Sequence, residues 1–278
     1  MKILITGAKG QLGYDVCKEL TARNITHKGA DVDDFDITDK TAVFAAIESY
    51  NPTTVIHCAA YTAVDKAEDE PELCRKINED GTRNIAEACK QINAKIIYIS
   101  TDYVFSGHGD HFYKPTDPTD PQSVYGKTKL AGEQAVQAIS DKYFIVRISW
   151  VFGENGNNFV KTMLKLGKER ESLNVVCDQI GSPTYTADLA PLLCDMAESE
   201  KYGIYHATNE GTCSWAEFAQ EIFRQAGLNT TVNPIPSSEY PTKATRPLNS
   251  RLDKSCINDG FQQLPLWTDA LKRFVRQM

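Results

Sequence analysis

The sequence lacks any long apolar run. No stretch approaches the ~20 apolar residues that a membrane-spanning helix needs, and the apolar run within the N-terminal "MKILITGAKG" is too short for a signal peptide. A run of basic residues is also missing, and the 278-residue chain has a net charge of −7. These absences argue against a membrane or nucleic-acid partner and predict a cytoplasmic protein.

Paired cysteines and paired histidines are missing as well. The eight cysteines include no C-x-x-C pair, and the five histidines include no H-x-x-x-H pair. Scattered cysteines of this kind are typical of reduced, buried thiols in a cytoplasmic protein. We therefore predict neither a disulfide framework nor a structural metal site, and we assign no residue as a metal ligand.

What is present is an ordinary globular composition, with 41% apolar and 24% charged residues. The first half alternates β-branched apolar runs with segments of helical periodicity. We expect strands at residues 2–6, 54–60, 95–100 and 143–149, and helices at residues 14–24, 40–51 and 74–93. Strands that alternate with helices predict an α/β fold with a doubly wound parallel sheet of the Rossmann type.

The second half of the chain has a different local composition. Loop signals are frequent in "FGENGNNF", "DQIGSPTYT" and "NPIPSSEYPTKATRPLNS". The helical segment "SWAEFAQEIFRQAG" begins with Ser214 and Glu217 at capping-box spacing. We expect residues 1–150 to form a dinucleotide-binding domain and residues 151–278 to form mostly a smaller, C-terminal substrate-binding lobe. A strand at about 202–208 is expected to return to the first sheet.

A glycine-rich turn follows the first expected strand directly. In "ITGAKGQLG", Gly7, Gly10 and Gly13 have the spacing G-x-x-G-x-x-G, between a strand and a helix. Glycine allows the tight turn and lets the backbone approach a diphosphate, which then lies at the N-terminus of the helix. The context predicts that these three residues bind a dinucleotide.

Acidic residues follow the glycine turn at a suitable distance. Asp31 lies 18 residues beyond the last glycine, where a carboxylate can bind a ribose hydroxyl, and Asp36 and Ile37 are placed to border the adenine. Acid near the ribose favours NAD, whereas His27 and Lys28 are placed to meet the 2′-phosphate of NADP. The sequence leaves the choice between NADH and NADPH open.

The pattern Y-x-x-x-K occurs twice, at Tyr14–Lys18 and at Tyr125–Lys129. This spacing places both side chains on one face of a helix, yet the pattern arises about once by chance in such a chain. Tyr14 lies on the helix after the glycine turn and is interpreted as structural. Tyr125 follows the strand expected at residues 95–100, after which comes Thr101, and ligands gather at the carboxyl ends of parallel strands.

The second pair has the chemistry of carbonyl reduction. Reduction adds a hydride to carbon and a proton to oxygen, and Tyr125 is a proton donor whose pKa of about 10 a nearby Lys129 ammonium lowers. The hydroxyl of Thr101 is a second donor that polarises the carbonyl. Asn78 is interpreted in two ways, as the holder of a water near Lys129 or as an amide that packs between helices.

With these residues in place, the sequence resembles the extended short-chain dehydrogenase/reductases, and within them the dTDP-4-dehydrorhamnose reductase family. The matching stretches are "TGAKGQLG", "AAYTAVDKAEDEPELCRKIN", "STDYVFSG", "VYGKTKLAGE", "RISWVFGENGNNFVKTM", "DQIGSPTYTADLA" and "YPTKATRPLNSRLD". Together they cover nearly the whole chain.

The resemblance implies an enzyme that reduces the C4 ketone of dTDP-4-dehydro-β-L-rhamnose to dTDP-L-rhamnose with NADPH or NADH. It implies that Tyr125 is the proton donor, Lys129 its partner and Thr101 the second hydroxyl, and that Asp102 contacts the substrate and tunes the site. By the same resemblance Trp150 packs on the sugar.

The resemblance also assigns residues to the cofactor and to the diphosphate of the substrate. Arg246 suits the diphosphate, because arginine forms bidentate, charge-assisted contacts with phosphate. The residues that the resemblance places along the cofactor are Gly10, Gln11, Leu12, Asp36, Ile37, Ala60, Tyr61 and Thr62, together with Tyr125 and Lys129.

Alternatives remain open at this point. One is a non-catalytic relative, like the regulatory subunit of methionine adenosyltransferase, which shares the fold. Another is a reductase, epimerase or dehydratase of a different nucleotide-linked deoxysugar. The base of the nucleotide, the use of magnesium and the choice between a monomer and a homodimer are not decided by the sequence.

Overall fold

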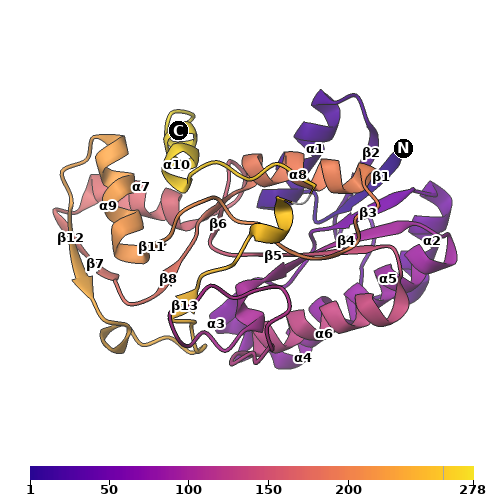
Figure 1. Ribbon diagram of the computed structural model, residues 1–278, viewed down its shortest axis with the longest axis horizontal. Coiled ribbons are helices and arrows are strands. Elements are labelled where there is room, and N and C mark those ends of the chain that lie inside the picture. The colour runs from indigo at the N-terminus through magenta and orange to yellow at the C-terminus, as the bar shows by residue number, and fades with distance from the viewer. Residues whose placement is uncertain (259) are drawn as a thin grey trace.

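The computed structural model describes residues 1–258 and 260–278. Its centre is a six-stranded sheet in which every neighbouring pair is parallel (Figure 1). The strands, in spatial order, are β2 (Thr26–Ala30), β1 (Lys2–Thr6), β3 (Thr54–His57), β4 (Lys95–Thr101), β5 (Tyr143–Ile148) and β10 (Gly203–His206). The predicted parallel α/β fold is therefore confirmed.

The direction of chain progression reverses between β1 and β3. From β1 the chain moves outward to β2, and it then returns to add β3, β4, β5 and β10 on the other side. Crossovers on either side of such a point leave a crevice outside the carboxyl ends of the strands, and ligands bind there. The topology therefore places a binding crevice next to the turn that follows β1.

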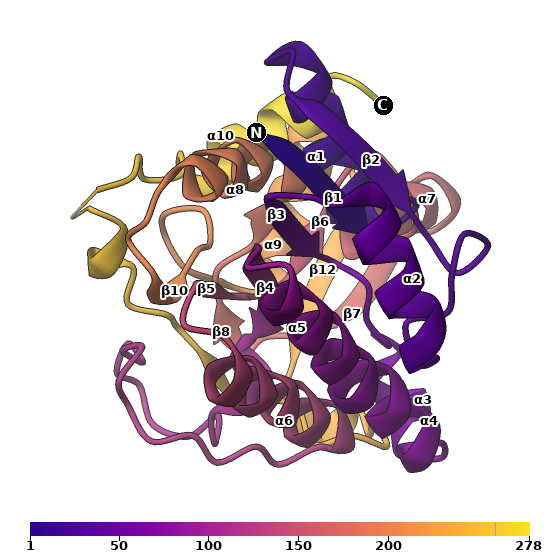
Figure 2. The same ribbon diagram turned by 90° about the vertical axis from the view of Figure 1, so that its right-hand side faces the viewer.

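Helices cover both faces of the sheet. On one face lie α1 (Gln11–Ala22) and α8 (Thr186–Glu198), and on the other lie α2 (Lys40–Tyr50), α5 (Thr82–Gln91) and α6 (Val124–Ile139), as Figures 1 and 2 show. The side-chain alternation of β1 follows from this arrangement. Ile3 and Ile5 join the core under α1 and α8, whereas Leu4 joins the core under α2, α5 and α6.

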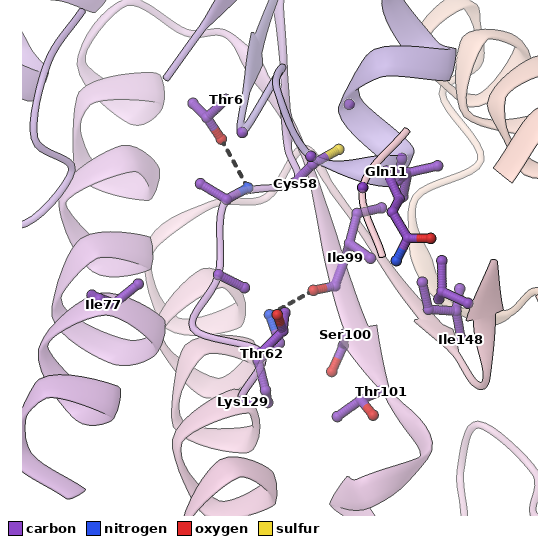
Figure 3. A pocket seen from close by; sticks show the side chains of 18 of the residues that line it. Thr6, Gln11, Cys58, Thr62, Ile77, Ile99, Ser100, Thr101, Lys129 and Ile148 are labelled. Carbon is purple, nitrogen blue, oxygen red and sulfur yellow. Dashed lines mark hydrogen bonds between the residues drawn. The ribbon is translucent and has the colours of Figure 1, made fainter. Parts of the chain in front are cut away.

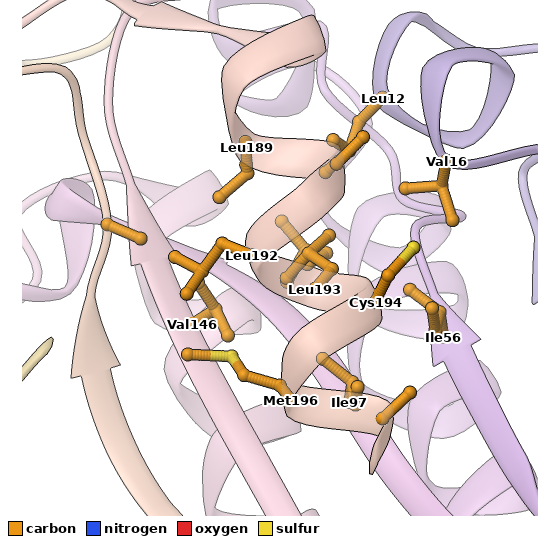
Figure 4. Packing of buried hydrophobic residues seen from close by; sticks show 14 of the residues in the cluster. Leu12, Val16, Ile56, Ile97, Val146, Leu189, Leu192, Leu193, Cys194 and Met196 are labelled. Atoms are coloured by element: carbon orange, nitrogen blue, oxygen red, sulfur yellow. The ribbon is translucent and has the colours of Figure 1, made fainter. Parts of the chain in front are cut away.

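Helix α8 belongs to the second half of the chain but packs on the sheet of the first half. In Figure 4, Leu192 and Leu193 of α8 lie over the strands, where Ile97 and Val146 are buried, and α8 faces Val16 of α1. All five side chains are buried. Because burial of each contributes on the order of 1.5–3 kcal/mol, this contact holds the two halves of the chain together.

The helix that the sequence predicts at residues 74–93 is present without a gap, but part of it is a π-helix. A π-helical turn, η1 (Lys76–Gly81), separates the short α4 (Pro71–Arg75) from α5, and α3 (Val64–Ala67) precedes them. A wider turn of this kind re-aims one residue, and π-turns are frequent at functional sites. Here it directs the side chain of Asn78 back toward the strand ends, as described below.

The remaining elements form a second layer beyond the sheet. Helices α7 (Phe159–Glu169), α9 (Trp215–Ala226) and α10 (Trp267–Val275) share one hydrophobic core. Small sheets accompany them: β7 (Ser172–Val176) with β12 (Thr231–Ile235), β6 (Val151–Phe152) with β9 (Thr184–Tyr185), and β8 (Ile180–Gly181) between β11 (Cys213–Ser214) and β13 (Asn249–Ser250). The capping box predicted for Ser214 and Glu217 is present at the start of α9.

Two further observations concern the part of the chain that the structure describes. None of its helices has the length and the hydrophobicity needed to cross a bilayer. Within the same residues, no group of three or more His, Cys, Asp and Glu side chains is arranged to hold a metal ion.

Candidate active site

A cavity of about 740 Å³ lies at the carboxyl ends of β1, β3, β4 and β5 (Figure 3). Most of the residues predicted from the sequence line it. These are Gly7, Gly10, Gln11, Leu12, Gly13, Asp31, Asp36, Ile37, Ala60, Thr62, Thr101, Asp102, Tyr125, Lys129 and Trp150. Tyr61 and Arg246, which were predicted with them, are not among the lining residues.

The glycine turn leaves the N-terminus of α1 open toward the cavity. Gly7 has a φ of +68°, which favours glycine, and a Cβ built on Gly13 would overlap the backbone of Gly7 and Ala8. Gly10 is the N-cap of α1, and no side chain caps the helix. The free N–H groups of the first turn and the helix dipole therefore form a site for a negatively charged group.

Asp31 lines the cavity where β2 ends. Its carboxylate accepts hydrogen bonds from the backbone N–H of Lys9 at 3.0 Å and from that of Val32 at 2.9 Å, which fixes its position. His27 and Lys28, the two residues considered for a 2′-phosphate, are absent from the lining of this cavity. The charged groups at this end are thus mainly acidic, with Lys9 as the adjacent cation.

Tyr61 turns its side chain away from the cavity, and Asn78 fixes its backbone. The side-chain amide of Asn78 accepts from the N–H of Tyr61 at 2.8 Å and donates to its C=O at 3.1 Å, while the Tyr61 hydroxyl donates to Glu70 at 2.8 Å. The same amide donates to the hydroxyl of Thr128 at 3.1 Å. Asn78 therefore acts as a buried amide that positions the loop after β3.

Lys129 projects from α6 into the cavity beneath the end of β4. Its ammonium donates to the backbone carbonyl of Ile99 at 2.7 Å (Figure 3) and lies 4.1 Å from the ring centroid of Tyr98. Burial lowers the pKa of Lys129 to about 7. The helix start that positions it is capped by Ser123, whose hydroxyl accepts from the N–H of Gly126 at 3.1 Å.

Tyr125 lies one helical turn before Lys129 and is partly buried in the site. The sequence predicts that the lysine lowers the pKa of this tyrosine, but the structure gives the opposite direction. Burial raises the pKa of Tyr125, and a hydrogen bond with Thr101 offsets part of the rise. Desolvation dominates, because the phenolate loses more from burial than its neighbours restore. The hydroxyl is thus protonated and suited to donate.

Thr101 ends β4 and Asp102 follows it directly, both near Tyr125. The Thr101 hydroxyl donates to Oδ1 of Asp102 at 2.9 Å, and the Ser250 hydroxyl donates to Oδ2 at 2.5 Å. Burial raises the pKa of Asp102 to about 6, although both hydrogen bonds act to lower it. A carboxylate with a shifted pKa therefore lies beside the two hydroxyls predicted to act on the carbonyl.

Trp150 forms the wall between this cavity and a smaller one. It has a φ of +50°, in the left-handed region that residues other than glycine rarely adopt, and its ring stacks on that of Trp215 with centroids 3.7 Å apart. Such strain persists at functional sites when packing enforces it. The smaller cavity, of about 160 Å³, is lined by Tyr103, Trp150, Gln179, Trp215, Pro247 and Ser250.

Arg246 lies beside the smaller cavity rather than in the larger one. Its guanidinium pairs with Asp65 at 2.6 Å and approaches the Tyr103 hydroxyl at 3.4 Å. Its sequence neighbour Pro247 and its partner Tyr103 both line the smaller cavity. The structure therefore places the arginine beside the smaller cavity and outside the lining of the larger one.

Several lining residues were missed by the sequence interpretation. Two of them, Gly156 and Asn157, lie in the loop after β6. Their neighbours tie this loop to the glycine turn, since Asn155 donates to the Lys9 carbonyl at 2.6 Å and Asn158 donates to Gln11 at 3.0 Å. The available signal was the "GENGNN" run directly after a strand. The other missed residues are Thr6, Lys9, Ala30, Val32, Phe35, Cys58, Ala59, Val64, Ile77, Ile99, Ser100, Tyr103, Ile148, Ser149 and Val151.

The other pair with Y-x-x-x-K spacing, Tyr14 and Lys18, lies outside the cavity. Neither Tyr14 nor Lys18 lines the cavity. Lys18 pairs with Glu154 at 2.6 Å and lies 5.4 Å from the ring centroid of Tyr14. This pair has a structural arrangement on α1, as interpreted from the sequence.

The chain is similar along its whole length to one protein family. Residues 1–278 match the model of the RmlD substrate binding domain. A dTDP-4-dehydrorhamnose reductase of Aggregatibacter actinomycetemcomitans is 45% identical over 285 residues, which cover 98% of this chain and 97% of that protein.

Solved structures resemble the chain equally closely. The dTDP-4-dehydrorhamnose reductase of Bacillus anthracis str. Ames, in complex with NADP, has a TM-score of 0.97 and 44% identity, covering 100% of this chain and 99% of that one. A dTDP-4-dehydrorhamnose reductase of Clostridium acetobutylicum ATCC 824 has a TM-score of 0.97 and 45% identity, covering 100% of both chains. This chain therefore belongs to the RmlD substrate binding domain family.

Proposed function

We propose that the chain is an NAD(P)H-dependent oxidoreductase that reduces the C4 ketone of dTDP-4-dehydro-β-L-rhamnose to dTDP-L-rhamnose. The observation that carries the proposal is the joining, in one cavity, of an open helix N-terminus with Thr101, Tyr125 and Lys129. The first feature suits a dinucleotide and the second suits carbonyl reduction. The whole-length similarity to reductases of this name supports the substrate.

The residues of the glycine turn fit a dinucleotide. Gly7 and Gly13 leave room where a Cβ would meet backbone, and the uncapped start of α1 supplies N–H donors to the diphosphate. Asp31 is placed for the adenosine ribose, and Asp36 and Ile37 border the adenine. When bound, the reduced nicotinamide supplies the hydride. A related reductase crystallised with NADP supports NADPH as one of the two cofactors.

Tyr125 supplies the proton. Its hydroxyl is protonated, since its pKa is raised, and it transfers the proton to the carbonyl oxygen as the hydride reaches C4. The Lys129 ammonium stabilises the phenolate that results, and the Thr101 oxygen, whose hydrogen is donated to Asp102, is a hydrogen-bond partner of the Tyr125 hydroxyl. Positioned acid catalysis of this kind contributes typically 10²–10⁴-fold to the rate.

The substrate lies on the other side of Tyr125. We assign Asp102 and Trp150 to the sugar and Arg246 to the diphosphate. In this scheme residues 1–150 serve mainly the cofactor, and residues 151–278 serve mainly the substrate while contributing α8 and β10 to the central sheet. We expect a monomer or homodimer that acts in the cytoplasm.

The test is NADPH oxidation with enzymatically generated dTDP-4-dehydro-L-rhamnose, with NADH in parallel and identification of the product. Rapid oxidation that yields dTDP-L-rhamnose supports the proposal, and the NADH comparison determines the cofactor preference. Cofactor binding without turnover contradicts it. That result favours another 4-keto nucleotide sugar, which further substrates would test, or a regulatory subunit on the same fold.

A further inference from the structure

The Asp102 carboxylate has a partner from the distant part of the chain. Ser250 of β13 lies 148 residues away in the sequence, and its hydroxyl donates to Oδ2 of Asp102 at 2.5 Å. Both residues are 3% exposed, so water does not compete for this bond. A hydrogen bond from a neutral donor to a buried carboxylate contributes more than an ordinary one.

Packing, rather than a loop, holds Ser250 in place. In the register of the small sheet, Ser250 lies opposite Gly181 of β8. A Cβ built on Gly181 would meet the Cβ of Ser250 at 3.0 Å and the Trp150 ring at 2.8 Å. Serine, glycine and tryptophan therefore form one closely packed group, and the serine hydroxyl has a fixed direction toward Asp102.

The other oxygen of the same carboxylate binds the catalytic threonine. Thr101 has a single hydroxyl hydrogen, and it donates this hydrogen to Oδ1 of Asp102 at 2.9 Å. The orientation of the Asp102 carboxylate therefore decides where the Thr101 oxygen and its hydrogen point. Without a partner for Oδ2, the carboxylate is free to rotate away from Thr101.

We infer that Ser250 is a positioning residue for carbonyl reduction, which holds the Asp102 carboxylate so that the Thr101 hydroxyl stays aligned with Tyr125. The inference rests on the proposed function of the site. Ser250 touches Asp102, and it acts on the reaction through that residue. Ser250 also lines the smaller cavity.

The pKa of Asp102 can be measured, and a purely structural role of Ser250 would leave this pKa unchanged. The titratable groups that interact with it are Tyr103 of its own turn and Tyr125 of α6, and burial raises the pKa of both. The Ser250 hydrogen bond lowers the pKa of Asp102. Removal of that hydroxyl therefore raises the pKa of Asp102. If the ionisation of Asp102 produces an acid limb in the pH profile of kcat, that limb moves to higher pH as well.

The experiment is a double-mutant cycle with Ser250→Ala and Asp102→Asn. A matched control is Ser182→Ala, which removes another buried hydroxyl of the same region, one that donates to the Gly211 carbonyl at 2.7 Å. We expect Ser250→Ala to lower kcat on the order of tenfold or more, since the lost bond is charge-assisted. NADPH affinity should stay the same, and adding Ser250→Ala to Asp102→Asn should have little further effect.

Three results would overturn the inference. The first is a kcat for Ser250→Ala equal to that of Ser182→Ala. The second is a double variant whose loss of kcat is the product of the losses in Ser250→Ala and Asp102→Asn. The third is an acid limb of the kcat pH profile that Ser250→Ala leaves in place. The pH dependence of unfolding provides a measurement that needs no substrate, because Asp102 contributes to it in the absence of turnover. If the wild-type chain shows no reductase activity, the proposed function fails, whereas an unshifted unfolding profile in Ser250→Ala contradicts the positioning role itself.

Discussion

The two sides of the cavity are built by different means. The glycine-turn side consists largely of backbone from one short segment, residues 7–13, with N–H groups directed at the ligand. On the substrate side, the adjoining smaller cavity is lined by side chains from segments that lie far apart in the sequence, including Trp150, Trp215 and Ser250. A ligand that binds to the backbone requires that no side-chain atoms be added at the glycines. A ligand that binds to side chains depends on the packing that holds those side chains in place.

The two sides therefore have different weaknesses. A substitution in the glycine turn should affect the cofactor, since the backbone there must approach the diphosphate closely. A substitution on the opposite side should affect the substrate or the alignment of the reacting groups, and it should leave cofactor binding intact. Tyr125 lies where the two sides meet, so its removal should affect chemistry alone.

The largest effect is expected for Tyr125→Phe. Loss of the hydroxyl removes the proton donor, and kcat should fall by about 10²–10⁴-fold. The affinity for NADPH, measured by quenching of protein fluorescence, should remain the same because the ring is retained. Tyr14→Phe is the matched control in the second tyrosine–lysine pair and should keep full activity. Near-normal turnover of Tyr125→Phe would show that another group donates the proton.

A substitution in the glycine turn should weaken cofactor binding and leave the substrate side unaffected. In Gly13→Ala the added Cβ overlaps the backbone of Gly7 and Ala8, so the turn must shift. We expect NADPH binding to weaken on the order of tenfold, about 1.4 kcal/mol. Gly10→Ala is a milder comparison, because its Cβ meets only the Gly7 carbonyl oxygen, at 3.2 Å. Equal affinities for Gly13→Ala and the unaltered chain would contradict backbone recognition.

Asp102 should make the stability of the chain depend on pH. Its pKa is raised by burial to about 6, above its usual 3.8, so the folded chain holds this proton more tightly than the unfolded chain. The resulting stabilisation is present below pH 3.8 and is lost as the pH rises through about 6. Between pH 4 and 7 the loss amounts to roughly 2–3 kcal/mol.

Chemical denaturation across that range provides the measurement. The free energy of unfolding of the unaltered chain should fall with rising pH more steeply than that of Asp102→Asn, which has no proton to lose. Parallel curves for the two proteins would mean that Asp102 titrates normally and is not desolvated as the structure indicates.

The smallest effect is expected at the tryptophan pair. Trp215→Leu removes the ring on which Trp150 stacks and leaves its strained backbone less well supported. An aromatic pair contributes about 0.5–1.5 kcal/mol, so KM for the sugar nucleotide should rise roughly threefold to tenfold. Trp267→Leu, a tryptophan of the same core that lines neither cavity, should lower stability without this change in KM. A rise in the NADPH dissociation constant instead would remove the distinction between the two sides.

Local patterns predicted much of the fold and one side of the site. The glycine spacing between a strand and a helix gave the open N-terminus of α1, and β-branched runs gave the buried strands. Tyr125 and Lys129 were recognisable because they follow a strand end by one crossover. In each case the signal lies within about twenty residues, and the chemistry depends on local backbone geometry.

Other features had no local signal. Asn78 had two interpretations until the π-helical turn showed it bonded to the backbone of Tyr61. The pKa of Tyr125 was predicted in the wrong direction, because desolvation depends on everything packed around the ring. Arg246 was expected with the other site residues, yet its partner Asp65 holds it outside the main cavity.

By itself the sequence determined the alternation of strands and helices in the first half, the glycine turn and the tyrosine–lysine pair that lines the cavity, since each depends on residue types at short spacing. Only the tertiary structure decided that Ser250 binds Asp102, that Trp215 supports Trp150, and that α8 covers the first sheet. These contacts join segments separated by tens to hundreds of residues. They exist because burial of apolar surface brings the segments together. The spacing of residues within one segment does not indicate which distant segment will pack against it.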